Sequence, residues 1–184
     1  MPIDRKGAAE AIDAFLRAIG RDPRVEPDLV GTGERVAAAF IDELCDGYAV
    51  DPAALVARHR IEARSGDLVV MRDVAVTTTC PHHLMTAKGV ATIAFAPRGA
   101  TVGLGALVQL VDACAHRLAL QERIGEDVVR ALDEALAPAW AACRLVLEHG
   151  CVVARGERRH GARAMTLAVR GDRALAERAL GALG

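Results

Sequence analysis

The order of hydrophobic patterns along the chain constrains its fold more than any other feature. Two segments rich in β-branched residues alternate between apolar and polar positions, two helical patterns follow, and two strand patterns return near the C-terminus. These expected elements are, in order, Asp67–Thr79, Gly89–Phe95, Gly105–Leu118, Gln121–Leu136, Arg144–Ala154 and Ala164–Val169. Strand pairs that flank a helix pair predict an antiparallel sheet with the helices on one face, which is an α+β fold.

Further helices are predicted on both sides of this core. Apolar residues recur at helical spacing from Ala8 onwards and stop at Gly20, a residue typical of helix C-termini. Thr32 is placed to cap a second helix that ends near Gly47. Asp51-Pro52 predicts the start of a short third helix, and Asp172–Leu183 has the pattern of a terminal one.

The length of 184 residues predicts one domain with a substantial core. We expect a helical part over 1–62, the sheet-containing core over 63–171 and the last helix over 172–184. A net charge of -1 gives no reason to expect affinity for nucleic acid or an anionic membrane. The chain has no apolar run of membrane-spanning length, no signal-peptide core in MPIDRKGAAE and an odd number of cysteines, so we expect a cytoplasmic protein without a disulfide framework.

The stretch VTTTCPHHLMTAKG brings a thiol and two imidazoles together at the end of a predicted strand. The spacing of Cys80 and His83 lets two ligands from one turn reach the same metal ion, and Cys151, on a later predicted strand, adds a third. Two sulfurs and one nitrogen with an open fourth position are typical of catalytic zinc. His82 and His149 then remain as imidazoles for proton transfer beside the metal.

Spacing alone leaves other interpretations open. A lone C-x-x-H is more often incidental than functional, and alternation along a strand is compatible with His149 or Cys151 facing the core. A structural patch, a metal site and a catalytic centre therefore all remain possible from the residue pattern.

Three motifs in order, CPHH, QER and HGCVVARG, resemble the GTP cyclohydrolase type I family. The resemblance extends to TGERVAAAFIDELCDG and LVVMRDVAVTTTCPHHLMTAKGVATIAFAP, and so spans Thr32 to Arg158. It implies a tunnelling fold, in which the antiparallel sheets of several subunits join into a barrel, usually in a decamer with sites at subunit interfaces. It also implies a zinc ion held by the residues that match the family's ligands: Cys80, His83 and Cys151.

The resemblance implies a role for each further residue of the site. A zinc-bound hydroxide attacks C8 of the guanine ring, the residue matching His82 protonates the ring nitrogen, and formate leaves after ring opening. His149 matches the second histidine, an acid and base during rearrangement to 7,8-dihydroneopterin triphosphate. Glu122 matches the carboxylate that accepts hydrogen bonds from the guanine N1–H and 2-amino group. The other matches are to substrate-binding residues: Gln121 beside Glu122, and the phosphate-binding arginines Arg35 and Arg155.

The chain departs from the family where the triphosphate is held. Gly105 and Ala106 stand in place of Ser-Lys, Gln109 stands in place of an arginine, and Pro81 replaces a glutamate between the metal cysteine and the acid. Loss of two cationic contacts costs on the order of 3–6 kcal/mol, or about 10²- to 10⁴-fold in affinity.

Three alternatives to opening of the purine ring of GTP follow. One is a diverged cyclohydrolase that acts on a purine or related heterocycle without the triphosphate. Another is a relative that binds a purine or pterin without catalysis, against which the retention of the whole Cys and His set speaks. A structural zinc domain is the third, but it would need neither His82 nor His149.

Overall fold

The computed structural model describes residues 2–64, 66–156 and 158–181. The chain divides into two compact units, Met1–Asp46 and Gly47–Gly184. The prediction of one domain over 1–184 stays a prediction. Among the described residues, no helix combines the length and the apolar character that a membrane span requires.

The N-terminal unit is helical, as the sequence predicts. Its helix α1 (Arg5–Ala18) begins where the Asp4 carboxylate accepts a hydrogen bond of 2.8 Å from the Gly7 N–H, and Gly20 follows its end with a left-handed φ of 83°. A 3-10 turn (Pro27–Leu29) precedes α2 (Thr32–Ala39), which continues as a π-helical turn (Phe40–Leu44).

The prediction that Thr32 caps the second helix is wrong. Gly31 occupies the N-cap position with a left-handed φ of 72°, which glycine adopts without steric cost, and Thr32 is the first helical residue. The Thr32 hydroxyl instead accepts a hydrogen bond from Arg35 at 3.1 Å.

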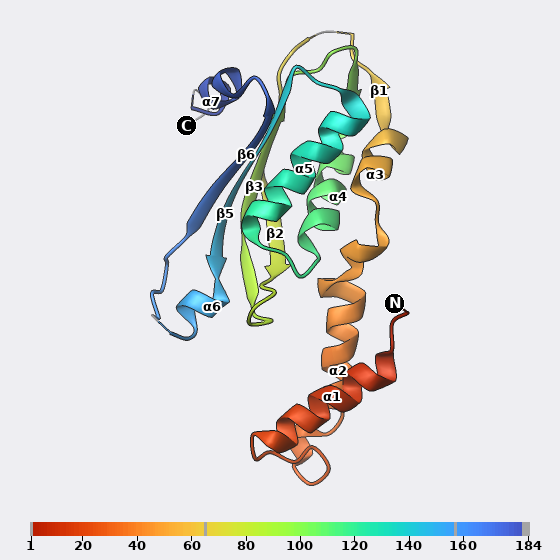
Figure 1. Ribbon diagram of the computed structural model, residues 1–184, viewed down its shortest axis with the longest axis vertical. Helices are drawn as coiled ribbons and strands as arrows, with labels where there is room; N and C mark the ends of the chain where they lie inside the picture. Colours follow the sequence, from red (N-terminus) through yellow and green to blue (C-terminus); the bar gives the residue numbers. More distant parts are fainter. Residues whose placement is uncertain (1, 65, 157, 182–184) are drawn as a thin grey trace. The chain divides into compact units, whose positions relative to one another are not determined.

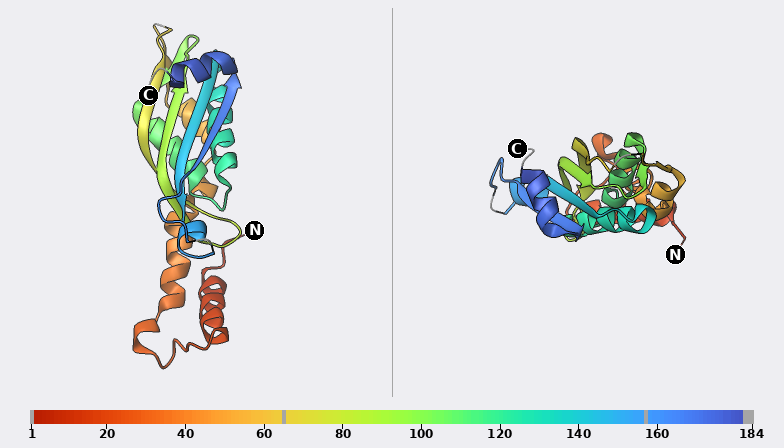
Figure 2. Two further views of the ribbon diagram at one scale, coloured as in Figure 1. Left: turned by 90° about the vertical axis from the view of Figure 1, so that its left-hand side faces the viewer. Right: turned by 90° about the horizontal axis from the view of Figure 1, so that it is seen from above.

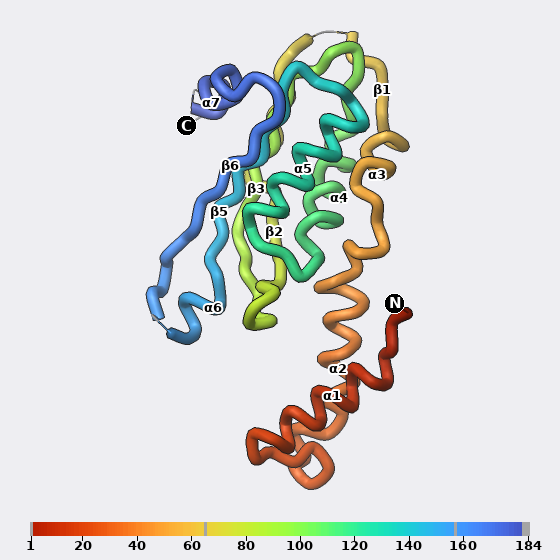
Figure 3. Tube along the Cα trace, in the orientation of Figure 1, coloured from red at the N-terminus to blue at the C-terminus, as the bar shows by residue number. Residues whose placement is uncertain are grey.

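Four antiparallel strands form the main sheet of the second unit, in agreement with the predicted fold class. They are β2 (Val69–Thr79), β3 (Thr86–Phe95), β5 (Trp140–His149) and β6 (Ala164–Gly171). Their spatial order is β2-β3-β5-β6, so the β3–β5 pair joins segments that lie far apart in the sequence. Figure 3 shows the chain running up and down through these strands.

The strand register fixes the location of the functional residues. Thr79 pairs with Thr86 across the turn between β2 and β3, and Ala87 pairs with His149 at the end of β5. The loop that carries Cys80 therefore lies at the same end of the sheet as His149.

The strand predicted over Arg144–Ala154 ends earlier than expected. The chain leaves β5 at His149 and enters a short helix, α6 (Gly150–Val153), so Cys151 lies on a helix and not on a strand. A Cβ atom at Gly150 would lie 2.7 Å from the Thr86 carbonyl oxygen, so this turn passes close to β3 because it has a glycine.

Two helices cover one face of the sheet, as predicted. They are α4 (Leu104–Ala115), which packs on β2, and α5 (Gln121–Leu136), which packs on β5 and β6 (Figure 1). Leu145 and Leu147 of β5 are fully buried on this side. Burial of each of these leucine side chains stabilises the fold by about 1.5–3 kcal/mol.

The opposite face of the sheet has a smaller apolar cluster. Trp140 and Ala142 of β5 contact Ala176 and Leu180 of the last helix, α7 (Arg173–Gly181). Figure 2 shows α7 on the side of the sheet away from α4 and α5. The predicted helix to Leu183 is thus confirmed up to Gly181, and its last residues lie outside the described range.

The structure also contains a second small sheet that the sequence pattern did not predict. Strands β1 (Arg60–Glu62) and β4 (Ala100–Val102) pair antiparallel. Three residues are too few to show alternation, and β1 is exposed throughout, which explains the omission. Helix α3 (Pro52–Arg58) precedes β1 and begins at Pro52, as predicted, and the Asp51 carboxylate caps it by accepting from the Ala53 and Ala54 N–H groups.

Candidate metal centre and active site

The loop after β2 holds Cys80 and His83 in a tight turn. The Cys80 N–H donates to the Met85 carbonyl and the Leu84 N–H donates to the Cys80 carbonyl, both at 2.9 Å. Leu84 has a left-handed φ of 52°, which is uncommon for a residue with a branched side chain. The two bonds close the turn and bring the Cys80 Sγ to 3.7 Å from the His83 Nδ1.

Cys151 completes a three-residue group from a distant part of the chain. One ligand atom from each of Cys80, His83 and Cys151 lies within 4.8 Å of the other two. Burial raises the pKa of the Cys151 thiol, and the adjacent Cys80 raises this pKa further. A divalent cation held by these atoms would offset the repulsion between two thiolates, and the donor set of two sulfurs and one nitrogen fits zinc.

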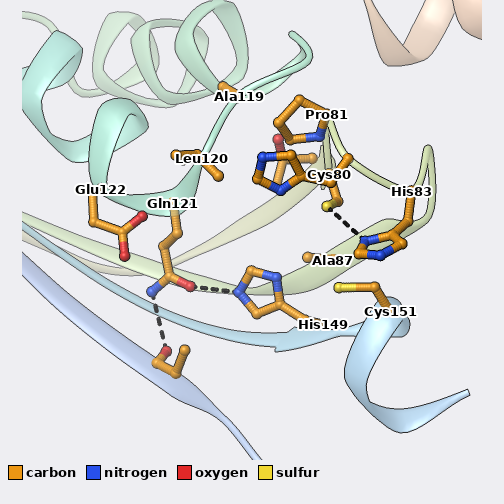
Figure 4. A pocket seen from close by; sticks show the side chains of 13 residues that line it. Cys80, Pro81, His83, Ala87, Ala119, Leu120, Gln121, Glu122, His149 and Cys151 are labelled. Atoms are coloured by element: carbon orange, nitrogen blue, oxygen red, sulfur yellow. Dashed lines mark hydrogen bonds between the residues drawn. The ribbon is translucent and has the colours of Figure 1, made fainter. Parts of the chain in front are cut away.

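A pocket of about 240 Å³ opens beside this group. Figure 4 shows the cysteines and His83 on one side of it, and Gln121 and Glu122 on the other. Its described lining consists of Thr78, Cys80, Pro81, His82, His83, Ala87, Ala119, Leu120, Gln121, Glu122, His149, Cys151 and Ala164. The two predicted catalytic histidines, the three predicted ligands and two of the predicted substrate contacts therefore share one pocket.

His82 and Pro81 form the outer part of the loop. His82 is exposed and lines the pocket, and its ring meets the ring of His83 edge to face, with 6.3 Å between centroids and an interplanar angle of 80°. His82 is therefore available to a ligand without belonging to the metal group.

His149 lies at the end of β5 and is held by Gln121, the first residue of α5. The His149 Nε2 lies 2.8 Å from the Gln121 Oε1. Gln121 itself is 4% exposed, and its amide nitrogen lies 3.1 Å from the Leu145 carbonyl, the Ala164 carbonyl and the Thr166 hydroxyl. These contacts direct the Gln121 amide toward other residues of the protein. The predicted role of Gln121 in substrate binding stays a prediction.

Glu122 follows Gln121 in the first turn of α5 and is exposed. Its carboxylate lies at the pocket on the opposite side from Cys151 (Figure 4). A carboxylate offers only acceptors, so this wall of the pocket favours a ligand with N–H donors.

The two predicted phosphate-binding arginines have different surroundings. The Arg155 Nη1 lies 3.1 Å from the His83 Nε2, so this guanidinium lies at the metal group. Arg35 belongs to the N-terminal unit, where its guanidinium donates to the Val30 carbonyl at 2.9 Å and to Thr32.

The three positions at which the resemblance implies a lost phosphate contact, Gly105, Ala106 and Gln109, lie in the first turns of α4. Gly105 and Gln109 are exposed, whereas Ala106 is buried. None of them lines the pocket that the described residues form. A Cβ at Gly105 would meet no atom within 4 Å, so the glycine is not required there by local packing.

The sequence did not predict the apolar residues of the pocket or the residues that hydrogen-bond the Gln121 side chain. Ala119 and Leu120 stand before α5, and Thr166 lies in β6 with the ordinary pattern of a β-branched strand residue. No local sequence signal distinguishes these residues from other residues of the same types, because only the tertiary fold places them at the site.

Comparisons with known proteins agree with the geometry. A family model described as GTP cyclohydrolase I matches residues 8–179. The GTP cyclohydrolase 1 of Leifsonia xyli subsp. xyli is 34% identical over 170 residues, which is 92% of this chain and 88% of the relative. That of Bifidobacterium longum is 36% identical over 174 residues, 91% of this chain and 83% of the relative.

Another relative, the GTP cyclohydrolase 1 of Thermobifida fusca, is 36% identical over 171 residues, covering 92% of this chain and 81% of the relative. Among solved structures, the archaeosine synthase QueF-Like in the apo form aligns with a TM-score of 0.48 and 18% identity, over 59% of this chain and 98% of that chain. The last likeness is too weak to bear on function. The family match and the three relatives, each aligned over most of its length, show that this chain belongs to the GTP cyclohydrolase I family, whose fold is the tunnelling fold.

Proposed function

We propose that the protein is a zinc-dependent cyclohydrolase that opens the imidazole ring of a guanine-type purine at C8. The reaction proposed is conversion of GTP to 7,8-dihydroneopterin triphosphate and formate. The observation that carries this proposal is the convergence of the three ligand atoms within 4.8 Å of one another, at a pocket that two further histidines line.

Cys80, His83 and Cys151 would hold the zinc ion. When bound, zinc lowers the pKa of water and so makes a nucleophile available near neutral pH. Three protein ligands are typical of a catalytic zinc site, whereas a structural site is typically held by four.

His82 and His149 supply the proton transfers that ring opening requires. His82 is exposed within the pocket, so it can reach the ring nitrogen of a bound purine and protonate it. His149 lies on the inner wall at the end of β5, where it can exchange protons during the later rearrangement.

Glu122 would orient the purine. Its carboxylate accepts from two adjacent N–H donors, which the N1–H and 2-amino group of guanine present. Arg155 and Arg35 are proposed to contact the phosphates. The Arg155 guanidinium would then have to leave the His83 ring, which it contacts in this structure, and bind the substrate instead.

A second candidate is a diverged cyclohydrolase for a purine or related heterocycle without a triphosphate. Within the described residues, the pocket lining contains the carboxylate of Glu122 but neither lysine nor arginine. Gly105, Ala106 and Gln109 provide no cation at the start of α4 either. A non-catalytic purine- or pterin-binding protein is the remaining alternative, but it gives no reason for both histidines beside the metal group.

We also propose a homo-oligomer, with the decamer of the family as the expected form. The strands β2 and β6 end the order of the sheet, so within the described chain each has an edge without a partner strand, apart from a single bridge between Thr79 and Leu118. Joining these edges between subunits would close the sheets into a barrel. The described cysteines are all free, and a zinc site with two thiolates needs a reducing environment, which supports a cytoplasmic location.

A substrate panel tests the proposal. The zinc-loaded protein is given GTP, GMP, guanosine, guanine, 8-oxoguanine and urate, and the products are followed by mass spectrometry. Conversion of GTP alone supports the first candidate, whereas turnover of a free base or nucleoside with GTP left intact supports the second. Tight binding of one compound without any turnover would contradict both and favour the binding protein.

A further inference from the structure

Gln121 is buried, and its side-chain amide has a single orientation that its neighbours allow. The amide nitrogen faces two backbone carbonyls, those of Leu145 and Ala164, at 3.1 Å each. Carbonyl oxygens are acceptors only, so the NH₂ group must point toward them. The reversed amide would place its oxygen against both carbonyl oxygens, where the single hydroxyl hydrogen of Thr166 could satisfy only one of the three, at a site where Gln121 is 4% exposed.

This orientation determines which nitrogen of His149 has the hydrogen. The Gln121 Oε1 lies 2.8 Å from the His149 Nε2, and an amide oxygen only accepts. The Nε2 of His149 must therefore donate, and in the neutral ring the Nδ1 then has the free lone pair. Figure 4 shows the ring between Gln121 and the side of the pocket that contains Cys80, with only one nitrogen bonded to the glutamine.

We propose that Gln121 is a positioning residue that holds the neutral His149 as its Nε2–H tautomer, so that Nδ1 enters the reaction as a proton acceptor. This inference rests on the proposed function, because His149 has a catalytic task only there. It also replaces the substrate contact expected for Gln121, since the amide is occupied by His149, two carbonyls and Thr166.

The surrounding structure makes the arrangement rigid. Gln121 begins α5, Leu145 lies in the middle of β5, and Ala164 and Thr166 belong to β6. One side chain thus connects a helix to two neighbouring strands, and the histidine that it holds ends one of those strands. Rotation of the His149 ring would break the bond to Gln121, so the tautomer and the ring orientation are fixed together.

The direct test is spectroscopic and needs no substrate. Zinc-loaded protein labelled with ¹⁵N-histidine is examined by NMR at a pH of about 8.5, where an ordinary imidazole is neutral. The signals of His149 are identified by their loss in His149→Gln. We expect a protonated Nε2 and an unprotonated Nδ1, and a protonated Nδ1 with a bare Nε2 would overturn the proposal.

Two variants separate positioning from substrate binding. Gln121→Met has a similar length but no acceptor, so the tautomer preference should be lost and kcat should fall about 10²-fold with KM nearly unchanged. Gln121→Glu places an oxygen against the Leu145 and Ala164 carbonyls, so its carboxyl group must be protonated to donate to one of them. Its other oxygen still accepts from the His149 Nε2–H, and this protonated nitrogen should be retained in the spectrum. A raised KM with unchanged kcat in Gln121→Met would instead assign Gln121 to the substrate and contradict the proposal.

The spectrum of the unsubstituted protein remains decisive if Gln121→Met does not fold. A failure of the proposed function is also distinguishable from a failure of this inference. If no purine is opened but His149 has the expected tautomer, the cyclohydrolase assignment is wrong and the hydrogen-bond assignment stands.

Discussion

The Sγ of Cys80 and the Nδ1 of His83 lie 3.7 Å apart, within one turn of the loop that follows β2. Cys151 comes to the same place from α6. Because three ligands are the minimum for a tetrahedral zinc with one open position, Cys151→Ala should lose metal and activity together, whereas the unsubstituted protein should contain about one zinc per chain. Elemental analysis of both purified proteins measures this.

Cys45→Ala is the matched control for that variant. Cys45 is also a half-buried free cysteine, but it lies in the N-terminal unit and outside the metal group. It should retain full zinc content. Full zinc occupancy in Cys151→Ala would remove Cys151 from the set of ligands.

His82→Ala should separate proton delivery from metal binding. His82 lines the pocket and is exposed, but it does not belong to the group of ligand atoms, so zinc content should not change. Formate release should fall about 10²- to 10⁴-fold, the usual contribution of a general acid. Formate release at the unsubstituted rate would show that another group donates the proton, and His149 would be tested next.

Much of this site was predictable because its chemistry lies in short motifs. The Cys80-x-x-His83 spacing predicted two ligands in one turn, and the structure confirms their proximity. The predicted strands and helix pair also occur in order, since long periodic segments give strong signals.

The errors arose where tertiary contacts decide the local structure. Cys151 lies on a short helix because the chain turns at Gly150 against β3, which no pattern within β5 reveals. Similarly, the helix α4 ends at Ala115 and not at Leu118, because Arg117 turns back and donates to the carbonyls of Gly47 and Val50. The hydrogen bonds of the buried Gln121 amide depend on two strands that follow it in the sequence, so they could not be predicted from the local pattern either.

The sheet edges predict assembly. In the described part of the chain, β2 and β6 each pair with one neighbouring strand only. Unpaired edges of this kind are closed in ring-shaped oligomers, so light scattering at micromolar concentration should report a large homo-oligomer, a decamer in the expected case. A monomer at that concentration would contradict the barrel.

Two buried thiols predict a loss of stability at alkaline pH. Burial raises the pKa of Cys114 and of Cys143 to about 12 in the folded protein. Below pH about 8.5 the thiols are protonated in both states and have no effect, but above it the unfolded chain loses these protons while the folded protein keeps them. The free energy of unfolding should therefore fall as pH rises, by about 2 kcal/mol per thiol between pH 8 and 10.

Urea denaturation at both pH values checks this, at one protein concentration, with Cys143→Ala as the comparison. The variant lacks one of the two thiols and should lose about 2 kcal/mol less over the same interval. Equal losses in the two proteins would show that Cys143 ionises in the folded state.

The central claim is ring opening of a guanine-type purine that depends on the metal group, and formate release tests it most directly. Guanine compounds labelled with ¹³C at C8, GTP first among them, are incubated with the zinc-loaded protein, with the protein after chelation, and after zinc is returned. We expect one labelled formate for each substrate consumed, its loss on chelation and its recovery with zinc. Formate release that persists after zinc is removed, or no formate from any guanine compound at full zinc occupancy, would contradict the account.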